Sequence, residues 1–259
     1  MRTARFILVL LLILAPLARA QFDFGKLSKG LDNLKDVGKI AKGAAKLGPK
    51  EEAEIGRGVA LEIISRFGGL VRDDEVMRRV NLVGRAVARF SSRPDAAWKF
   101  GVLESRSVNA MSAPDNYVFI TRGLYELADS DDALAGILGH EIAHITKRHA
   151  LSIVERSEVV SGLSSIATKQ SGQVQQVNET LKQVGLGVDK VINTMFEKGF
   201  DPQTEYEADK EGRNLASTTG YAQNGLRNVL VELQKKHGNT TQVFSTHPPL
   251  QERIKRLPD

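Results

Sequence analysis

Two histidines four residues apart, with a glutamate between them, are the residues of this chain best suited to bind a metal ion. They form the run His140-Glu141-Ile142-Ala143-His144. If this run is helical, both imidazoles lie on one face, about one turn apart, and can reach the same ion. Glu141 then lies about 100° further round the helix. There it is suited to act as the catalytic base, taking a proton from water that the metal activates.

The residues around this run are apolar, which favours a buried metal site. Leu134, Ile137, Leu138, Ile142 and Ile145 surround the motif. Imidazoles and a carboxylate are costly to bury unless something pairs with them. Imidazole nitrogen suits zinc, so we predict one Zn²⁺ per chain, although several divalent ions accept such ligands. The alternative is a pair of hydrogen-bonded histidines in the core.

A catalytic zinc site needs a third protein ligand, and the run 205–209, Glu-Tyr-Glu-Ala-Asp, offers two glutamates. Glu205 shares its helical face with small and apolar residues, whereas Glu207 shares its face with charged ones. We therefore expect Glu205 to bind the metal and Glu207 to face water. Asp209, one turn after Glu205, is placed to accept a hydrogen bond from the outer nitrogen of a ligand histidine, and we expect that histidine to be His140.

The elements that must position these residues are mostly helical. Proline, glycine and aspartate signals predict helices over 49–67, from 73–74 to about Phe90, over 131–150 with Asp131 as cap, over 202–219, over 223–236, and after Pro249. The stretch 152–196 is expected to form two helices. Three short strands are predicted at Trp98–Leu103, Val108–Met111 and Tyr117–Thr121. The predicted fold class is α+β, mainly α-helical, with a small three-stranded sheet packed on the helix that carries the metal-binding run.

Several motifs together resemble a family of metallopeptidases related to HtpX, to the Ste-type CAAX prenyl protease and to the periplasmic proteins BepA and LoiP. The matching residues are Asn109-Ala110, Pro114, the run 121–124, His140 to His144, Arg148-His149, the Glu-x-x-Ala-Asp run 205–209, the run 247–249, and Arg253-Ile254. The likeness covers roughly residues 51–257. One departure is Asp115-Asn116, which stands where many relatives have glycines.

The resemblance implies a gluzincin, or zincin-like, fold, zinc as the metal, and endopeptidase activity on protein or peptide substrates. It supports His140, His144 and Glu205 as ligands and Glu141 as base. It also suggests that Val108, Asn109, Ala110 and Met111 form a substrate-binding edge, to which a peptide backbone would add as a further strand.

Two further histidines have no role in this scheme. The neighbouring prolines hold His247 in a stiff loop, where it is a candidate catalytic residue that donates a hydrogen bond to the oxyanion. The alternatives are that it caps the open position of the zinc, or that it is a helix-start residue without a catalytic role. His149 lies nine residues after His140, about 180° round a continuous helix, so we predict a structural hydrogen bond rather than metal binding.

The N-terminal residues predict export. Arg2 and Arg5 precede an apolar run from Phe6 to Leu14, and Ala18-Arg19-Ala20 fits cleavage after Ala20. The run is short for a membrane span, although an uncleaved anchor is the rival interpretation. Cleavage would remove three arginines and no acids, lowering the net charge from +5 to +2 and weakening any argument for a nucleic-acid partner. The absence of cysteine excludes disulfides.

We therefore divide the chain into a signal peptide at 1–20, an amphipathic or mobile lead-in at 21–50, and a zinc metallopeptidase domain at 51–259. Residues 22–48 combine lysines with spaced apolar residues, so they either contact a membrane surface weakly or form a solvated arm. The predicted function is a zinc endopeptidase, periplasmic or secreted, acting on misfolded or unassembled envelope proteins. The alternative is a periplasmic chaperone or assembly factor with a latent zinc site.

Overall fold

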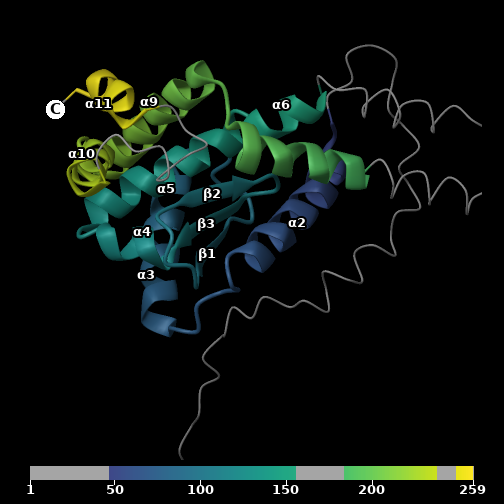
Figure 1. The fold of residues 1–259 in the computed structure, drawn as a ribbon, viewed down its shortest axis with the longest axis horizontal. Coiled ribbons are helices and arrows are strands. Elements are labelled where there is room, and N and C mark those ends of the chain that lie inside the picture. Colours follow the sequence, from purple (N-terminus) through teal and green to yellow (C-terminus); the bar gives the residue numbers. More distant parts are fainter. Residues whose placement is uncertain (1–46, 156–183, 238–248, 259) are drawn as a thin grey trace, which may run out of the picture. The chain divides into compact units, whose positions relative to one another are not determined.

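The computed structural model describes residues 47–155, 184–237 and 249–258 (Figure 1). The predicted signal peptide, residues 21–46 of the lead-in, and His247 lie outside the described residues. The described part is mainly helical and contains one three-stranded sheet, which confirms the predicted fold class. No helix of the described residues combines the length and apolar character needed to cross a bilayer.

Helices α2 (Pro49–Arg66) and α3 (Asp74–Ala88) begin where the sequence signals place them, and α2 also ends there. Proline stands in the first turn of α2, and Gly68 and Gly69 follow its end with φ angles of 82° and 91°. The Asp73 side chain caps α3 by accepting hydrogen bonds from two backbone N–H groups. The sequence also predicted that this helix reaches about Phe90 and turns that side chain toward a core, which was wrong: α3 ends at Ala88, and Phe90 is 52% exposed.

The sheet has the order β1-β3-β2, formed by β1 (Lys99–Leu103), β2 (Ala110–Ala113) and β3 (Tyr117–Thr121). β1 pairs with β3 in parallel and β2 pairs with β3 antiparallel. The prediction for the second strand was two residues early. Thr121 explains the shift, because its hydroxyl oxygen accepts the Asn109 N–H at 3.0 Å and so takes the place of a backbone partner.

The helix that carries the metal-binding run is α5 (Asp131–Thr146), and all of its residues from Ala133 to Ile145 are buried. Its cap is Ser130, not Asp131 as predicted, because the Ser130 hydroxyl accepts the Ala133 N–H. It also ends four residues before the predicted Ala150. Arg148 takes a left-handed φ of 58°, which breaks the helix and starts α6 (His149–Glu155) in a new direction.

The C-terminal helices cover the other side of α5. Residues 184–193 are helical and continue into the π-helical turn η2 (Thr194–Lys198). They are followed by α9 (Pro202–Thr219), α10 (Gly225–His237) and α11 (Leu250–Arg256). Asp201 caps α9 and Gly220 ends it in the left-handed conformation, both as predicted.

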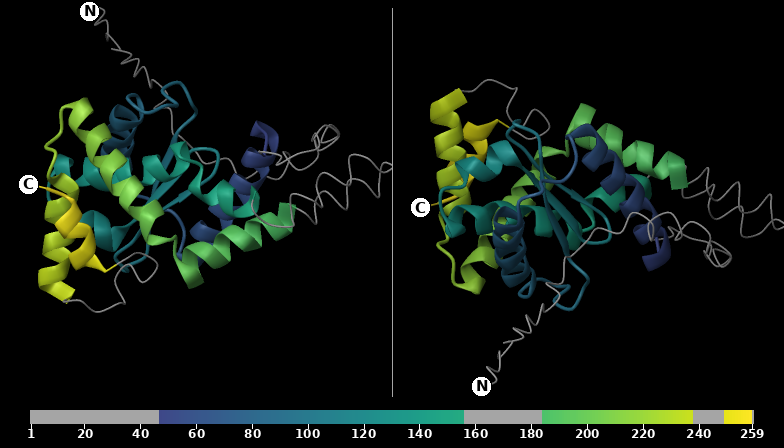
Figure 2. Two further views of the ribbon diagram at one scale, coloured as in Figure 1. Left: turned by 90° about the horizontal axis from the view of Figure 1, so that it is seen from above. Right: turned by 90° about the horizontal axis from the view of Figure 1, so that it is seen from below.

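α5 lies between the sheet and the C-terminal helices. It packs against β2 and β3 on one side and against α9 and α10 on the other (Figure 2). α4 (Arg122–Leu127) follows β3 directly. The approach of α5 to α9 is close because Gly139 faces Gly212: a Cβ on Gly139 would stand 2.6 Å from the Gly212 carbonyl oxygen. The two helices that carry the predicted ligands are therefore in backbone contact.

Candidate metal centre

The structure brings together the three predicted ligand side chains. His140 and His144 project from α5, and Glu205 projects from α9; they are 3%, 4% and 0% exposed. The Nε2 atoms of the two histidines are 3.1 Å apart. Glu205 Oε2 lies 3.6 Å from His140 Nε2, and Glu205 Oε1 lies 3.6 Å from His144 Nε2.

These distances fit a divalent ion of zinc size. Ligand atoms bound at about 2.1 Å to a tetrahedral ion lie about 3.4 Å from one another. The observed separations of 3.1, 3.6 and 3.6 Å bracket that value. Two imidazole nitrogens and one carboxylate also form a ligand set that zinc accepts, and three protein ligands leave a fourth position open. The residues present therefore fit the metal that the sequence implies.

Asp209 connects His140 to a buried arginine on the last helix. Asp209 Oδ1 lies 2.9 Å from His140 Nδ1, so the outer nitrogen of that ring has a carboxylate partner. Arg253 of α11 donates two hydrogen bonds to Asp209, at 2.6 and 2.9 Å. Burial by itself raises the pKa of Asp209, but the Arg253 guanidinium and His140 hold it well below its usual range. Burial lowers the pKa of His140, but the hydrogen bond to Asp209 and the charges of Asp209 and Glu141 together outweigh burial and raise that pKa.

His144 has its own set of neighbours. His149 Nδ1 lies 2.9 Å from His144 Nδ1, and the ring of Phe200 stacks on His144 with centroids 4.7 Å apart. Burial lowers the pKa of His149. The predicted structural hydrogen bond of His149 is present, but the helical phase used to predict it was wrong, because the break at Arg148 turns His149 back toward the site.

Glu141 is buried on α5, with a 4% exposed side chain next in sequence to His140. Its negative charge contributes to raising the pKa values of both His140 and Arg253. It therefore lies within electrostatic reach of the ligand cluster.

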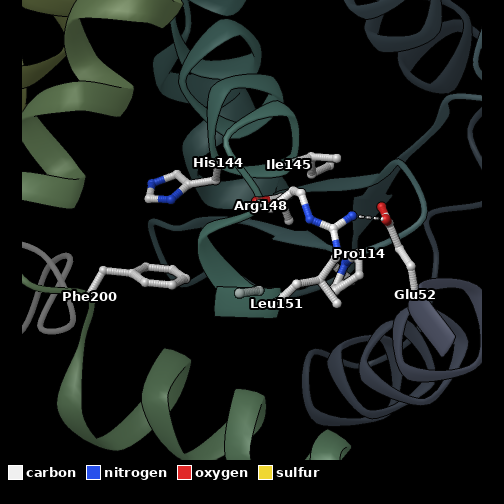
Figure 3. Close-up of a pocket in the computed structure, with 10 residues that line it drawn as sticks. Glu52, Pro114, His144, Ile145, Arg148, Leu151 and Phe200 are labelled. Atoms are coloured by element: carbon white, nitrogen blue, oxygen red, sulfur yellow. Dashed lines mark hydrogen bonds and ion pairs between the residues drawn. The ribbon is translucent and has the colours of Figure 1, made fainter. Parts of the chain in front are cut away.

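Of the predicted substrate edge, only Ala110 and Met111 belong to β2, while Val108 and Asn109 precede it. β2 pairs with β3 on one side, and within the described residues no strand pairs with its other side. A small pocket opens beside this strand, and its lining includes Ser112, Ala113, Pro114, His144, Leu151 and Phe200 (Figure 3). The strand edge, the pocket and the metal cluster are therefore neighbours.

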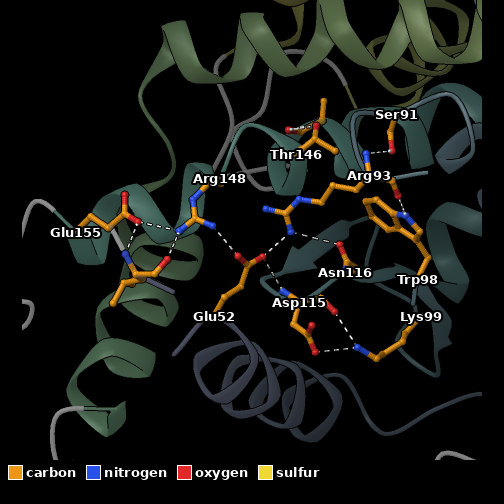
Figure 4. A network of polar contacts seen from close by, with 12 residues as sticks. Glu52, Ser91, Arg93, Trp98, Lys99, Asp115, Asn116, Thr146, Arg148 and Glu155 are labelled. Carbon is orange, nitrogen blue, oxygen red and sulfur yellow. Dashed lines mark hydrogen bonds and ion pairs between the residues drawn. The ribbon is translucent and has the colours of Figure 1, made fainter. Parts of the chain in front are cut away.

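A buried glutamate that the sequence analysis missed lies at the far end of this pocket. Glu52 of α2 accepts hydrogen bonds from Arg93 at 2.5 Å and from Arg148 at 2.6 Å (Figure 4). Arg148 also binds Glu155 and the carbonyl oxygen of Leu47. Leu47, just before α2, is buried as well.

The turn between β2 and β3 is left-handed at two residues that are not glycine. Asp115 and Asn116, between β2 and β3, have φ angles of 62° and 66°. Aspartate and asparagine tolerate this left-handed conformation better than other side chains. Lys99 holds the turn by donating hydrogen bonds to the Asp115 carbonyl oxygen and carboxylate. Both residues therefore suit the left-handed backbone of this turn.

The mainly helical fold and the cluster of two histidines and a glutamate are those of a zinc metallopeptidase. The profile of peptidase family M48 matches residues 75–259, which is more than half of the chain. The chain belongs to this family.

Individual relatives are distant. The chain is 25% identical over 181 residues to the mitochondrial metalloendopeptidase OMA1 of Schizosaccharomyces pombe, covering 69% of this chain and 51% of that protein. It is 27% identical over 161 residues to the metalloprotease YcaL of Escherichia coli, covering 62% and 61%. It is 20% identical over 226 residues to the beta-barrel assembly-enhancing protease of the same organism, covering 86% and 46%. The chain thus spans about half to three fifths of the length of these relatives.

Among solved structures, the chain is similar to Ste24p of S. mikatae. The sequence identity is 18%, and the match covers 78% of this chain and 55% of that chain with a TM-score of 0.42.

Proposed function

We propose that this protein is a zinc-dependent endopeptidase. The observation that carries the proposal is the convergence of His140, His144 and Glu205 within a spacing that suits one divalent ion, in a chain of peptidase family M48. The bound ion would supply Lewis-acid chemistry and lower the pKa of water at the open position.

The residues of the chain divide the remaining work. His140, His144 and Glu205 hold the ion. Asp209 accepts a hydrogen bond from the Nδ1–H of His140, which leaves the Nε2 lone pair of that ring for the metal. Glu141 takes a proton from the attacking water and passes it to the nitrogen of the leaving amine. The unpaired side of β2 receives the substrate backbone as an added strand, with Ala110 and Met111 as its first contacts.

We further propose that the protein is exported and acts on envelope proteins that are misfolded or unassembled. The N-terminal sequence supports export. The name of one relative, a beta-barrel assembly-enhancing protease, supports a role near envelope assembly. The roles proposed for His247 and for the segment 22–48 concern residues outside those described and stay predictions.

The decisive variant is Glu141→Gln. It should retain zinc, measured by mass spectrometry of metal content, and retain its fold, but lose nearly all digestion of casein. Chelation should abolish digestion by the parent protein, and added Zn²⁺ should restore it. Glu126→Gln, an exposed glutamate of α4, is the matched control and should keep full activity.

Two results would count against the proposal. A parent protein that holds no divalent metal would contradict the proposed metal centre. A Glu141→Gln variant that digests casein at the parental rate would contradict the proposed role of Glu141 as the base. A variant without peptidase activity that still restores function to a deletion strain would instead support the assembly-factor alternative.

A further inference from the structure

We propose that His149, held by Glu207, is the positioning residue that orients His144 toward the metal. The inference rests on the metal site proposed above and concerns residues that this site does not include. The Nδ1 atoms of His144 and His149 are 2.9 Å apart, and their rings are nearly perpendicular, at 79°. His149 is 8% exposed, so this contact is buried.

The direction of the hydrogen bond follows from the requirements of metal binding. His144 presents Nε2 to the cluster, so that nitrogen must carry the lone pair and Nδ1 must carry the proton. The Nδ1 atom of His149 must then accept, because two N–H groups cannot face each other. The proton of His149 consequently lies on Nε2. Metal binding at His144 thus fixes the tautomer of a second histidine.

Glu207 faces the nitrogen that this tautomer protonates. Its Oε2 atom lies 3.6 Å from His149 Nε2, and its Oε1 atom lies 3.2 Å from the Lys147 ammonium. His140 contacts the carboxylate of Asp209 directly. His144 is linked to the carboxylate of Glu207 in a similar way, but with His149 between them. In both cases a carboxylate from α9 supports a ligand histidine of α5. The sequence analysis assigned Glu207 to water; its side chain is 48% exposed, yet it also has these two partners.

The break in the helix after α5 is what brings His149 to this position. A continuous helix would carry the ring about 180° away from His140. The left-handed Arg148 breaks the helix instead, and its guanidinium is fixed by Glu52, Glu155 and Leu47. Phe200 closes the arrangement, because its ring lies 4.7 Å from that of His144 and 6.3 Å from that of His149.

The first experiment measures zinc affinity by competition with a chelator, using the full mature chain. His149→Leu removes the acceptor and should weaken zinc binding about 10- to 100-fold. His149→Asn keeps an acceptor oxygen near the Nδ1 position and should restore most of the loss. Glu207→Ala should weaken binding less than His149→Leu does. Glu211→Ala is the matched control. Glu211, which is also on α9, lies near Lys147 without contacting His149. This variant should bind zinc like the parent.

The second experiment reads the tautomers directly. Nitrogen-15 NMR of the zinc-loaded parent protein should find the proton on Nδ1 of His144 and on Nε2 of His149. A proton on Nδ1 of His149 overturns the proposal. This test uses the parent protein, so it remains valid even if His149→Leu does not fold. Parental zinc affinity in a folded His149→Leu variant also overturns it. A parent protein that binds no zinc is a different result, because it removes the proposed metal site itself.

Discussion

Replacing Arg253 with methionine tests the buried ion pair that supports His140. Arg253 and Asp209 are 1% and 2% exposed and share two hydrogen bonds, at 2.6 and 2.9 Å. Removing one partner of such a pair leaves a buried charge and costs about 3–5 kcal/mol. That is a large part of a typical free energy of unfolding of about 5–15 kcal/mol. For a domain of this size it corresponds to a fall in Tm of about 6–20 °C.

The assay is urea unfolding followed by circular dichroism, with parent and variants measured at the same pH. Lys255→Met removes the same charge from an exposed position of the same helix and should change stability by less than about 0.5 kcal/mol. The double variant Asp209→Leu with Arg253→Met removes both charges and should recover part of the loss. An Arg253→Met variant that loses less than about 1 kcal/mol would refute the reasoning, because it would mean that Asp209 does not depend on this arginine.

Three further predictions concern the surroundings of the site. Asp201→Ala removes the cap of α9 and should cost about 1 kcal/mol near neutral pH. The hydrogen bonds from Thr204 lower the pKa of Asp201 in the folded protein. The contribution of Asp201 to the free energy of unfolding is therefore present above the unfolded pKa of about 3.9 and is lost as the pH falls through the folded pKa. Urea unfolding should therefore show the difference from the parent shrinking below about pH 4; a constant difference would contradict it. Gly212→Ala places a Cβ against the backbone nitrogen of His140, so it should lower the free energy of unfolding by about 1–3 kcal/mol and weaken zinc binding. The Cβ of Gly220→Ala meets no atom, so this control should lose stability but keep zinc affinity. Glu52→Ala leaves Arg93 and Arg148 without their shared carboxylate and should cost about 1–3 kcal/mol in thermal unfolding; an unchanged Tm would show that the cluster is not stabilising.

The sequence was most informative where local rules decide the structure. Proline at the start of α2, the aspartate caps of α3 and α9, and the glycines after α2 and α9 placed five helix ends correctly. Helical phase also separated Glu205 from Glu207, because the buried face of α9 is the small and apolar face of the sequence. These features depend on neighbours within a turn, which a sequence shows directly.

The sequence was least informative where distant residues decide the structure. Nothing near Arg148 predicts a left-handed residue there, since its stability comes from Glu52, Glu155 and Leu47. The shift of β2 depends on the hydroxyl of Thr121, at the end of the next strand. The partnership of Arg253 with Asp209 joins helices 44 residues apart in sequence. The only available signal was the placement of Arg253 at the end of the motif series that resembles the family.

The glycine contact between α5 and α9 has a consequence for how the site behaves without its ion. Because the two backbones touch at Gly139 and Gly212, the three ligand side chains all project from one closely packed pair of helices. We expect this packing to hold the ligand side chains close together without the cation, so that little ordering opposes metal uptake. The metal site is in this sense preorganised. Removal of the ion with a chelator should leave the ligand side chains in place, so that the site can bind an ion again.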